Sequence, residues 1–351
     1  ADDEVTYRRN TEAYETCDLV PNVLAGVENI DLTTTVMGIP MDMPLFLSPT
    51  ALQRLFHHDG ERAVGRAAEA FNTLFGISSL ATVGIEEIGE TIRTPKIFQL
   101  YYHKDKALTW GMIDRCRQAG FDALALTVDT IVGGNRERDL WTGFTSPPRL
   151  TPSSLVSFAT HPSWTLNYLL REPFELSNLK DHIPEGSNVS ISVSDYFSTM
   201  LDQTMDWDAA AEVRKRWGKA FCLKGIMSVE DARKAVDIGA DAIMVSNHGG
   251  RQLDGSRSPF DQLAEIVDAV GDQIDVICDG GIQRGTHVLK ALSVGAKACS
   301  GGRWYLYALA GAGQAGVQRA LTNMQSELVR DMKLMGAKTI SDLSRANLRF
   351  R

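Results

Sequence analysis

His248 and Arg251 lie three residues apart in the stretch SNHGGRQLDG, directly after the apolar run AIMV. An imidazole can accept a proton, and a guanidinium can bind a carboxylate through two parallel hydrogen bonds. The glycines between them allow a tight turn, so that both side chains can reach one ligand. The spacing indicates a site that binds an anionic substrate and removes a proton from it. For this stretch taken alone, an ordinary surface loop is the alternative.

The composition excludes several classes of protein. A chain of 351 residues with 44% hydrophobic and 23% charged residues is typical of a soluble globular protein. The net charge of -8, without a cluster of Lys and Arg, gives no reason to expect a nucleic-acid partner. The five cysteines are scattered through apolar runs, so we expect no disulfide framework and no metal site. The opening ADDEVTYRRN shows no secretory signal and no apolar run is long enough to span a membrane, so we expect a cytoplasmic protein.

Short apolar runs alternate with longer amphipathic stretches from residue 44 onward, as in parallel sheets with crossover helices. Eight runs are candidate strands: 44–50, 74–80, 96–101, 122–130, 220–226, 241–248, 275–281 and 297–303. The clearest helical stretches are 60–71, 107–120, 228–239, 260–271 and 284–296. Eight units predict an α/β fold, a (β/α)8 TIM barrel, as a single domain over 1–351. A doubly wound sheet is less suitable, because SPTALQRL after the first strand lacks a dinucleotide fingerprint.

An inserted segment over 140–206 breaks the regular spacing after the fourth strand. Its stretches SPPRLTPSS and IPEGSN are rich in turn residues, and its middle mixes Phe158, Trp164 and Tyr168 with leucines. Loops of this length are commonly lids or partner surfaces. We expect a lid that packs on the barrel or a partner-binding segment, and the aromatic side chains would also suit peripheral contact with a membrane.

Polar residues gather where the predicted strands end. In a barrel these carboxyl ends meet on one rim, which is where barrel enzymes carry their sites. The residues concerned are Thr50, Ser78, Gln99, Tyr101, Thr127, Asp129, Lys224, His248, Asp279 and Arg303. Their hydroxyl, amide and ammonium groups suit the edge of a polar heterocycle, and the glycine turns beside Arg303 suit a phosphate. Lys224 alone would equally suit a lysine that forms a Schiff base.

Several motifs together resemble one enzyme family. SNHGGRQLD, LALTVDT followed by GGNRERD, FQLYY, LSPTAL, LKGI and ICDGG occur, in order, along nearly the whole chain. They resemble the FMN-dependent L-2-hydroxy acid dehydrogenases and oxidases, a family that includes glycolate oxidase and mandelate dehydrogenase. The resemblance implies FMN as cofactor and a homotetramer as the assembly, and it disfavours a Schiff base at Lys224.

The resemblance also implies a role for each residue that contacts the substrate. His248 corresponds to the catalytic base, and Asp129 pairs with it to stabilise the imidazolium. Tyr101 would hydrogen-bond the substrate oxygen. Arg251 would bind the substrate carboxylate, with Arg136 as a second arginine.

The family's cofactor positions map onto a larger set of residues. These are Pro49, Thr50, Ala51, Ser78, Gln99, Thr127, Lys224, Ser246, Asp279, Gly280, Gly281, Gln283, Gly302 and Arg303. Lys224 would lie beside the flavin ring, where its charge stabilises the reduced anion. Gln283 stands where the family usually has a phosphate-binding arginine, so the phosphate would depend more on Arg303. Trp304 replaces a common proline, and we expect it to pack locally below the phosphate site.

The expected reaction is oxidation of a short L-2-hydroxy acid to the 2-keto acid. Ala51 and Leu80 occupy two positions on the substrate side. Leu80 resembles the lactate-type members of the family, which favours L-lactate, while a pocket of Ala and Leu would also admit a longer or aromatic acid. The apolar insertion favours a dehydrogenase that passes electrons to a quinone or another carrier, at the cytoplasmic face of a membrane if the insertion binds there. An oxidase that reduces O2 to H2O2 is the alternative within the family. A flavin-binding partner protein without catalysis is an alternative of another class, which the retained site residues disfavour.

The family also carries a substrate-binding tyrosine ahead of the segment that ADDEVTYRRN matches. The chain printed here begins after that point, and we expect it to be a truncated piece.

Overall fold

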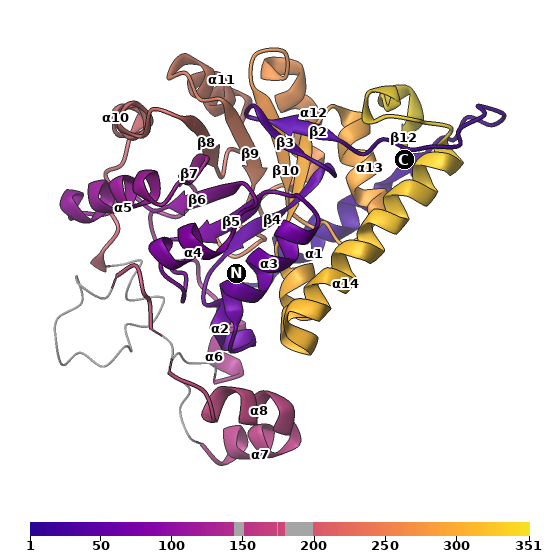
Figure 1. Cartoon of the computed structure of the whole chain (residues 1–351). Coiled ribbons are helices and arrows are strands. Elements are labelled where there is room, and N and C mark those ends of the chain that lie inside the picture. The colour runs from indigo at the N-terminus through magenta and orange to yellow at the C-terminus, as the bar shows by residue number, and fades with distance from the viewer. Residues whose placement is uncertain (144–150, 174, 180–198) are drawn as a thin grey trace.

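The computed structural model describes residues 1–143, 151–173, 175–179 and 199–351 (Figure 1). Its centre is a closed barrel of parallel strands in the order β10-β11-β4-β5-β6-β7-β8-β9. The strands are β4 (Leu45–Thr50), β5 (Phe75–Ser78), β6 (Lys96–Leu100), β7 (Ala123–Thr127), β8 (Ala220–Lys224), β9 (Ala242–Ser246), β10 (Asp275–Asp279) and β11 (Ala298–Gly301). The predicted (β/α)8 barrel is therefore confirmed. Several strands end earlier than predicted, β7 at Thr127 and β9 at Ser246, because the chain leaves the sheet there to form the loops of the rim.

A helix follows each barrel strand and covers its outer face (Figure 1). These helices are α3 (Gly60–Ala70), α4 (Ile85–Thr91), α5 (Lys106–Gln118), α10 (Trp207–Trp217), α11 (Val229–Asp237), α12 (Pro259–Val270), α13 (Gly285–Val294) and α14 (Arg303–Met335). Several of them begin at a side-chain cap. The Ser228 side chain accepts a hydrogen bond from Asp231 N at the start of α11, and the Ser258 side chain accepts one from Asp261 N at the start of α12. The five predicted helical stretches are thereby confirmed. Helix α14 is longer than the others and is interrupted at Gly313, where φ is 57°.

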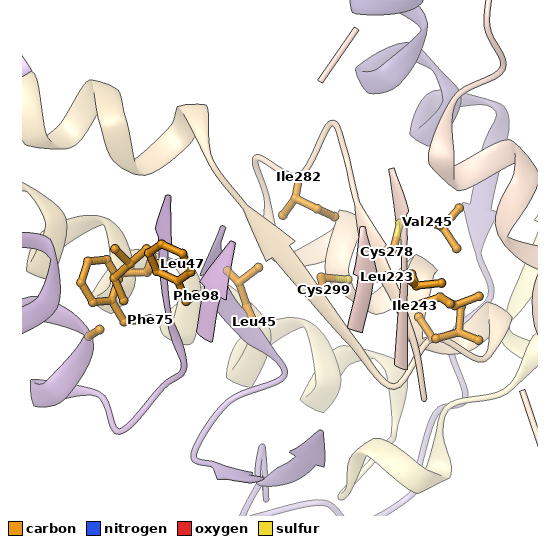
Figure 2. Packing of buried hydrophobic residues seen from close by; sticks show 14 of the residues in the cluster. Leu45, Leu47, Phe75, Phe98, Leu223, Ile243, Val245, Cys278, Ile282 and Cys299 are labelled. Carbon is orange, nitrogen blue, oxygen red and sulfur yellow. The ribbon is translucent and has the colours of Figure 1, made fainter. Parts of the chain in front are cut away.

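The buried side chains form two apolar layers, because successive residues of a strand point to opposite faces. Phe46, Ile97 and Met244 belong to the cluster inside the barrel. Leu45, Leu47, Phe75, Phe98, Leu223, Ile243, Val245, Cys278 and Cys299 belong to the outer cluster, which packs against the helices (Figure 2). Each fully buried aliphatic side chain contributes about 1.5–3 kcal/mol. The apolar runs that predicted the strands therefore reflect burial on both faces.

Short elements close the barrel and join the chain ends. The hairpin β2 (Thr34–Val36) and β3 (Ile39–Met41) adds Val36 and Met41 to the inner cluster, and Met37 N donates to Asp275 at the start of β10. Strand β1 (Cys17–Leu19) pairs antiparallel with β12 (Leu348–Phe350). The N-terminal helix α1 (Val5–Glu12) and the turn η1 (Ala13–Thr16) precede β1, and the turns η3 (Ile340–Asp342) and η4 (Arg345–Asn347) precede β12.

The inserted segment contains helices α7 (Pro152–Thr160) and α8 (Pro162–Leu169), which follow α6 (Glu137–Trp141). Figure 1 shows this pair at the margin of the molecule. The indole of Trp164 donates to Leu55 O at 2.9 Å, within the short helix α2 (Gln53–Phe56). The predicted lid covered residues 140–206, of which 144–150, 174 and 180–198 lie outside the described residues.

Candidate active site

A buried polar side chain lies at or near the carboxyl end of each barrel strand. Together they form a layer that we call the polar ring: Ser48, Ser78, Gln99, Thr127, Lys224, Ser246, Asp279 and Ser300. Ser78 Oγ donates to Gln99 Oε1 at 3.0 Å, and Gln99 Nε2 donates to Thr127 Oγ1 at 2.8 Å. Neighbouring strands are therefore linked through their side chains as well as through their backbones.

The other half of the polar ring is organised around Asp279. Lys224 Nζ lies 2.8 Å from one carboxylate oxygen, which also accepts from Ser246 Oγ at 2.7 Å. The second oxygen accepts from Ser300 Oγ at 2.6 Å and from Ser48 Oγ at 3.1 Å. Burial alone would raise the pKa of Asp279, but the Lys224 ammonium and these hydrogen bonds lower it. Burial would likewise lower the pKa of Lys224, and the charges of Asp279 and Asp129 raise it.

Two members of the polar ring were missed by sequence reasoning. Ser48 and Ser300 stand two residues before Thr50 and Gly302, which were predicted as site residues. Because side chains alternate along a strand with a period of two, Ser48 points to the same side as Phe46 and Ser300 to the same side as Ala298, both of which belong to the cluster inside the barrel. This alternation was the sequence signal from which both serines could have been predicted.

His248 lies two residues beyond β9 and has a left-handed backbone conformation, with φ of 57°. This conformation is uncommon for a residue with a side chain and is found often at functional sites. The His248 N–H donates to Ser246 Oγ at 3.2 Å, which ties the loop to the polar ring. Nδ1 of the His248 ring lies 3.1 Å from Asp129 Oδ1, two residues beyond β7.

The protonation of this pair follows from its surroundings. Burial lowers the pKa of His248, and the charges of Lys224 and Arg136 add to this effect, although Asp129 opposes it. Burial would raise the pKa of Asp129, but the His248 contact and the Lys224 charge lower it. An uncharged imidazole therefore faces an ionised carboxylate near neutral pH, which is the state that a general base requires. Gly225 makes room for the pair, since a Cβ there would lie 2.6 Å from Asp129 Cβ.

Arg136, Arg251 and Tyr101 surround the same region. Burial lowers the pKa of Arg136 to about 10, and the charge of Arg251 is the next cause. Burial raises the pKa of Tyr101, and Asp129 adds to this effect while both arginines oppose it. Two guanidinium groups held in proximity repel each other, and one of them is buried, so an anionic ligand between them would be stabilised.

Helix α1 braces the loop that carries His248 and Arg251. The side chains of Asn10 and Asn247 exchange two hydrogen bonds, at 2.8 and 2.7 Å. The carboxylate of Asp254 accepts from Thr6 N at 2.8 Å and from Val5 N at 3.2 Å. We call this set of contacts the α1 clasp. No pattern in the sequence predicted it.

Gly280 and Gly281 follow β10, and Gly281 lies against the same helix α1. Gly281 has φ of 70°, and a Cβ there would lie 1.7 Å from Asn10 O, so no other residue fits. A Cβ at Gly280 would lie 2.6 Å from Pro259 Cγ. Gln283 lies on the exposed side, where its amide is 3.5 Å from Thr11 Oγ1.

Arg303 begins α14, directly after Gly302. Its guanidinium donates to Gly249 O at 2.7 Å and stacks over the Tyr7 ring, 4.7 Å from the centroid. The neighbouring Trp304 lies against the backbone of Gly301, where an added Cβ would be 1.9 Å from the indole nitrogen. This is the kind of local packing that the sequence predicted for Trp304.

The remaining predicted residues lie at the end of β4 and on the loops after β4 and β5. Pro49 and Thr50 end β4, and Ala51 follows. Leu80 is buried and lies two residues beyond β5. Leu52 N donates to Leu80 O at 3.1 Å, which joins the two loops that carry Ala51 and Leu80. Within the described part of the chain, no cluster of three or more His, Cys, Asp or Glu has the arrangement of a metal site.

The geometry agrees with the comparison to known proteins. A model of the FMN-dependent dehydrogenase family matches residues 1–350. The chain belongs to this family.

Named relatives of this family member give the same result. It is 40% identical to an L-lactate oxidase of Nostoc over 98% of this chain and 89% of that protein. It is 36% identical to a glycolate oxidase of Spinacia oleracea over 99% of this chain and 88% of that protein. A crystal structure of a monotopic membrane protein, (S)-mandelate dehydrogenase, superposes with a TM-score of 0.94 at 31% identity, covering 100% of this chain and 92% of that one. The protein is thus an FMN-dependent oxidoreductase of 2-hydroxy acids.

The residues present fit FMN by the chemistry of their donors. The polar ring offers hydroxyl, amide and ammonium groups from four consecutive strands, β5 to β8. This set can bind the oxygen and nitrogen atoms along the edge of a flavin ring. The start of α14 and the guanidinium of Arg303 supply the positive end of a helix and a cation for a phosphate.

Proposed function

We propose that this enzyme oxidises a short L-2-hydroxy acid, with L-lactate as the favoured substrate, and passes the electrons to a quinone or another carrier. The observation that carries the proposal is the hydrogen bond between His248 Nδ1 and Asp129 Oδ1. It leaves Nε2 of a neutral imidazole available as a base, beside the guanidinium groups of Arg136 and Arg251. A proton acceptor next to a carboxylate site is what oxidation of a 2-hydroxy acid requires.

Each side chain has a defined task in this proposal. Arg251 and Arg136 bind the substrate carboxylate and so orient the carbon that is oxidised. Tyr101 hydrogen-bonds the hydroxyl oxygen of the substrate, and His248 Nε2 removes a proton. The ionised Asp129 stabilises the imidazolium that results. FMN, when bound, supplies the acceptor for the two electrons of the substrate.

The cofactor would be held by residues of the rim. We assign the flavin ring to the loop after β4 and to the polar ring, and the phosphate to the ends of β10 and β11: Pro49, Thr50, Ala51, Ser78, Gln99, Thr127, Lys224, Ser246, Asp279, Gly280, Gly281, Gln283, Gly302 and Arg303. The Lys224 ammonium stays charged in its contact with Asp279, so it can stabilise negative charge on a neighbouring ring.

The preference for L-lactate rests on Leu80, which resembles the lactate-type members of the family, although a pocket lined by Ala51 and Leu80 would also admit a longer or aromatic acid. Ala51 and Leu80 lie on loops that are joined by a backbone hydrogen bond. The 40% identity with an L-lactate oxidase supports the same choice of substrate. Because one methylene group changes substrate binding by only about 1–3 kcal/mol, a panel of acids is needed to establish the preference.

A surface on the inserted segment supports a membrane-associated acceptor. Helices α7 and α8 contain no charged residue. Five apolar side chains on and after them are exposed, and we call them the α7–α8 patch: Leu155, Val156, Leu166, Leu169 and Leu170. A patch of this kind suits the interface of a bilayer. The mandelate dehydrogenase of similar structure is a monotopic membrane protein. Within the described residues, none of the helices combines the length and the apolar character that a bilayer crossing needs.

The first test is an anaerobic titration of the FMN-loaded protein with L-lactate and a panel of longer and aromatic L-2-hydroxy acids. We expect L-lactate to bleach the visible flavin band fastest. Rapid recovery with a quinone analogue and slow recovery in air would support the dehydrogenase. If the flavin binds but no acid reduces it, the proposal is wrong and a non-catalytic flavin-binding protein becomes the better interpretation.

The membrane contact is tested by sedimentation with phosphatidylcholine vesicles. Leu169 and Leu334 each expose 66% of their surface, but only Leu169 lies in the α7–α8 patch. We expect Leu169→Glu to reduce sedimentation with the vesicles and Leu334→Glu, on α14, to leave it unchanged. Equal effects of the two substitutions, or no sedimentation of the unaltered protein, would exclude this surface as the membrane contact.

A second candidate is an oxidase that transfers the electrons to O2 and produces H2O2. The identity with the Nostoc L-lactate oxidase favours it. In the titration above, fast recovery of the flavin in air with formation of H2O2 would establish the oxidase. We also propose a homotetramer as the assembly, which light scattering after size exclusion would test.

A further inference from the structure

Thr130 has contacts that the proposed roles leave unexplained. It follows Asp129 directly, is only 3% exposed, and extends its hydroxyl toward two atoms of the site. Thr130 Oγ1 lies 2.8 Å from Asp129 Oδ1 and 3.2 Å from His248 Nδ1. Since Oδ1 and Nδ1 are themselves 3.1 Å apart, the three atoms form a closed triangle.

The protons in this triangle can be assigned from donor capacity. The Thr130 hydroxyl has one proton, and its shorter contact is to the charged Asp129, where a hydrogen bond is stronger. Thr130 Oγ1 therefore presents only lone pairs to His248 Nδ1. Because both neighbours of Nδ1 are acceptors, the neutral ring must carry its proton on Nδ1. The lone pair then lies on Nε2, the nitrogen that faces away from Asp129 and Thr130.

The hydrogen bonding of the Asp129 carboxylate depends on its contact with Thr130. Asp129 Oδ2 is buried and has no hydrogen-bond partner among the described residues, so Oδ1 carries the side-chain contacts. These come from Thr130 and His248. Removal of the hydroxyl would leave His248 as the remaining donor to this oxygen.

We propose that Thr130 is a positioning residue for His248: its hydroxyl binds Asp129 Oδ1 and fixes the imidazole with the Nε2 lone pair directed to the substrate. This assignment rests on the proposed role of His248 as base. It goes beyond the pairing of His248 with Asp129, because it makes a third side chain responsible for the orientation and the charge of the pair.

Removal of the Thr130 hydroxyl would change the pKa of His248 in two opposite ways, and the shorter contact decides the sign. The 3.2 Å contact to Nδ1 is weaker than the 2.8 Å hydrogen bond to the charged Asp129 Oδ1, so the loss of the latter dominates. The charged and titratable groups around His248 are Asp129 at the end of β7, Lys224 on β8, Arg136 and Arg251 on the rim loops, and Tyr101 after β6. Without the Thr130 hydroxyl, less of the Asp129 charge is neutralised by hydrogen bonding. The imidazolium is then more stable, so the pKa of His248 rises and the acid limb of the activity moves to higher pH.

The test compares two substitutions with a control. Thr130→Val removes the hydroxyl at nearly constant volume, and Thr130→Ser keeps it. Thr73→Val is the control, because Thr73 is also buried and donates to Leu45 O at 2.7 Å, near the opposite end of the strands. Flavin content and melting temperature are measured for each variant, and flavin reduction by the preferred acid is followed as a function of pH.

We expect Thr130→Val to lower the limiting rate of flavin reduction about tenfold, the lower end of the effect known for groups that orient metal-ligating histidines. The midpoint of the acid side of the rate-against-pH curve should rise by about half to one pH unit. The affinity for the hydroxy acid should stay close to that of the unaltered protein. Thr130→Ser and Thr73→Val should leave both the rate and the acid limb nearly unchanged. An unmoved acid limb in Thr130→Val, or equal damage in Thr130→Ser, would overturn the proposal.

A second readout separates this inference from the proposed function. If no hydroxy acid reduces the flavin of the unaltered protein, the proposed function fails, but the protonation of His248 remains measurable. Diethyl pyrocarbonate reacts with the neutral ring, and mass spectrometry of the His248 peptide gives its rate of modification at each pH. We expect Thr130→Val to shift the midpoint of this reaction to higher pH, and an unchanged midpoint would refute the role of Thr130.

Discussion

Replacement of Asp279 by asparagine would test the energetics of the polar ring. The two carboxylate oxygens of Asp279 accept from Ser48, Ser246 and Ser300 and contact the Lys224 ammonium. The Lys224 side chain is only 6% exposed and that of Asp279 10%, so the pair is shielded from water. The Asp279→Asn substitution would keep the shape of the side chain but would remove its charge and turn one acceptor into a donor. Because an unpaired buried charge results, we expect a loss of about 3–5 kcal/mol in the free energy of unfolding.

The way in which this loss of unfolding free energy depends on pH gives a sharper test than the size of the loss. In the unaltered protein the pKa of Lys224 is raised, so the contribution of this pair is constant from below neutral pH until the lysine deprotonates in alkali. In Asp279→Asn, burial would instead lower the pKa of Lys224 below its value in the unfolded chain. The unfolded state would then bind more protons than the folded state, and the stability of the variant would rise with pH.

The assay is urea unfolding followed by tryptophan fluorescence, with saturating FMN, at about pH 6 and about pH 9, on either side of neutrality. Ser300→Ala serves as the control, since it removes one hydrogen bond to Asp279 and should cost only about 0.5–1.5 kcal/mol at either pH. A loss in Asp279→Asn no larger than in this control, or one that does not diminish as the pH rises, would refute the reasoning.

Further predictions concern the proposed base His248, the carboxylate-binding Arg251 and the backbone at Gly281. We expect His248→Gln to slow flavin reduction about 10²–10⁴-fold while FMN stays bound; a rate near that of the unaltered protein would exclude this base. Because burial lowers the pKa of His248, kcat/KM should be constant around neutral pH and fall only below about pH 6.5; a decline toward alkaline pH instead would contradict the assignment. Arg251→Lys should raise KM about 10–100-fold through loss of the guanidinium fork, as initial rates would show. Gly281→Ala should lower the melting temperature strongly because its Cβ would meet Asn10 O, whereas Gly26→Ala, also at positive φ, has nothing within 4 Å and should be milder.

The barrel was predictable because its strands are buried on both faces. A run such as AIMV, which lies in β9, has apolar residues at every position for that reason. The rule that barrel sites form at the carboxyl ends of the strands then brought distant residues such as Asp129 and His248 to one rim. Their contact at 3.1 Å agrees with that prediction of proximity.

Contacts between distant segments were less accessible to sequence reasoning. Ser48 meets Asp279 across 231 positions of the chain, and nothing local distinguishes it from other strand serines. Thr130 resembled an ordinary loop residue, because its importance depends on where His248 lies. Helix α14 was not among the predicted helical stretches, and it consists of two helical parts on either side of a kink at Ala312 and Gly313, where the backbone is not helical.

The α1 clasp has a consequence for the order in which the enzyme is completed. Asn10 and Asn247 are 237 positions apart, so a ribosome must make most of the chain before the two amides can meet. Helix α1 is synthesised before this loop and has nothing to brace until residues 247–254 have been added. Early strands can pair with their neighbours during this period, because such contacts are short in sequence. The α1 clasp therefore forms late in folding, and a nascent chain that stops after His248 but before Asp254 carries the proposed base on a loop that is not yet fully braced.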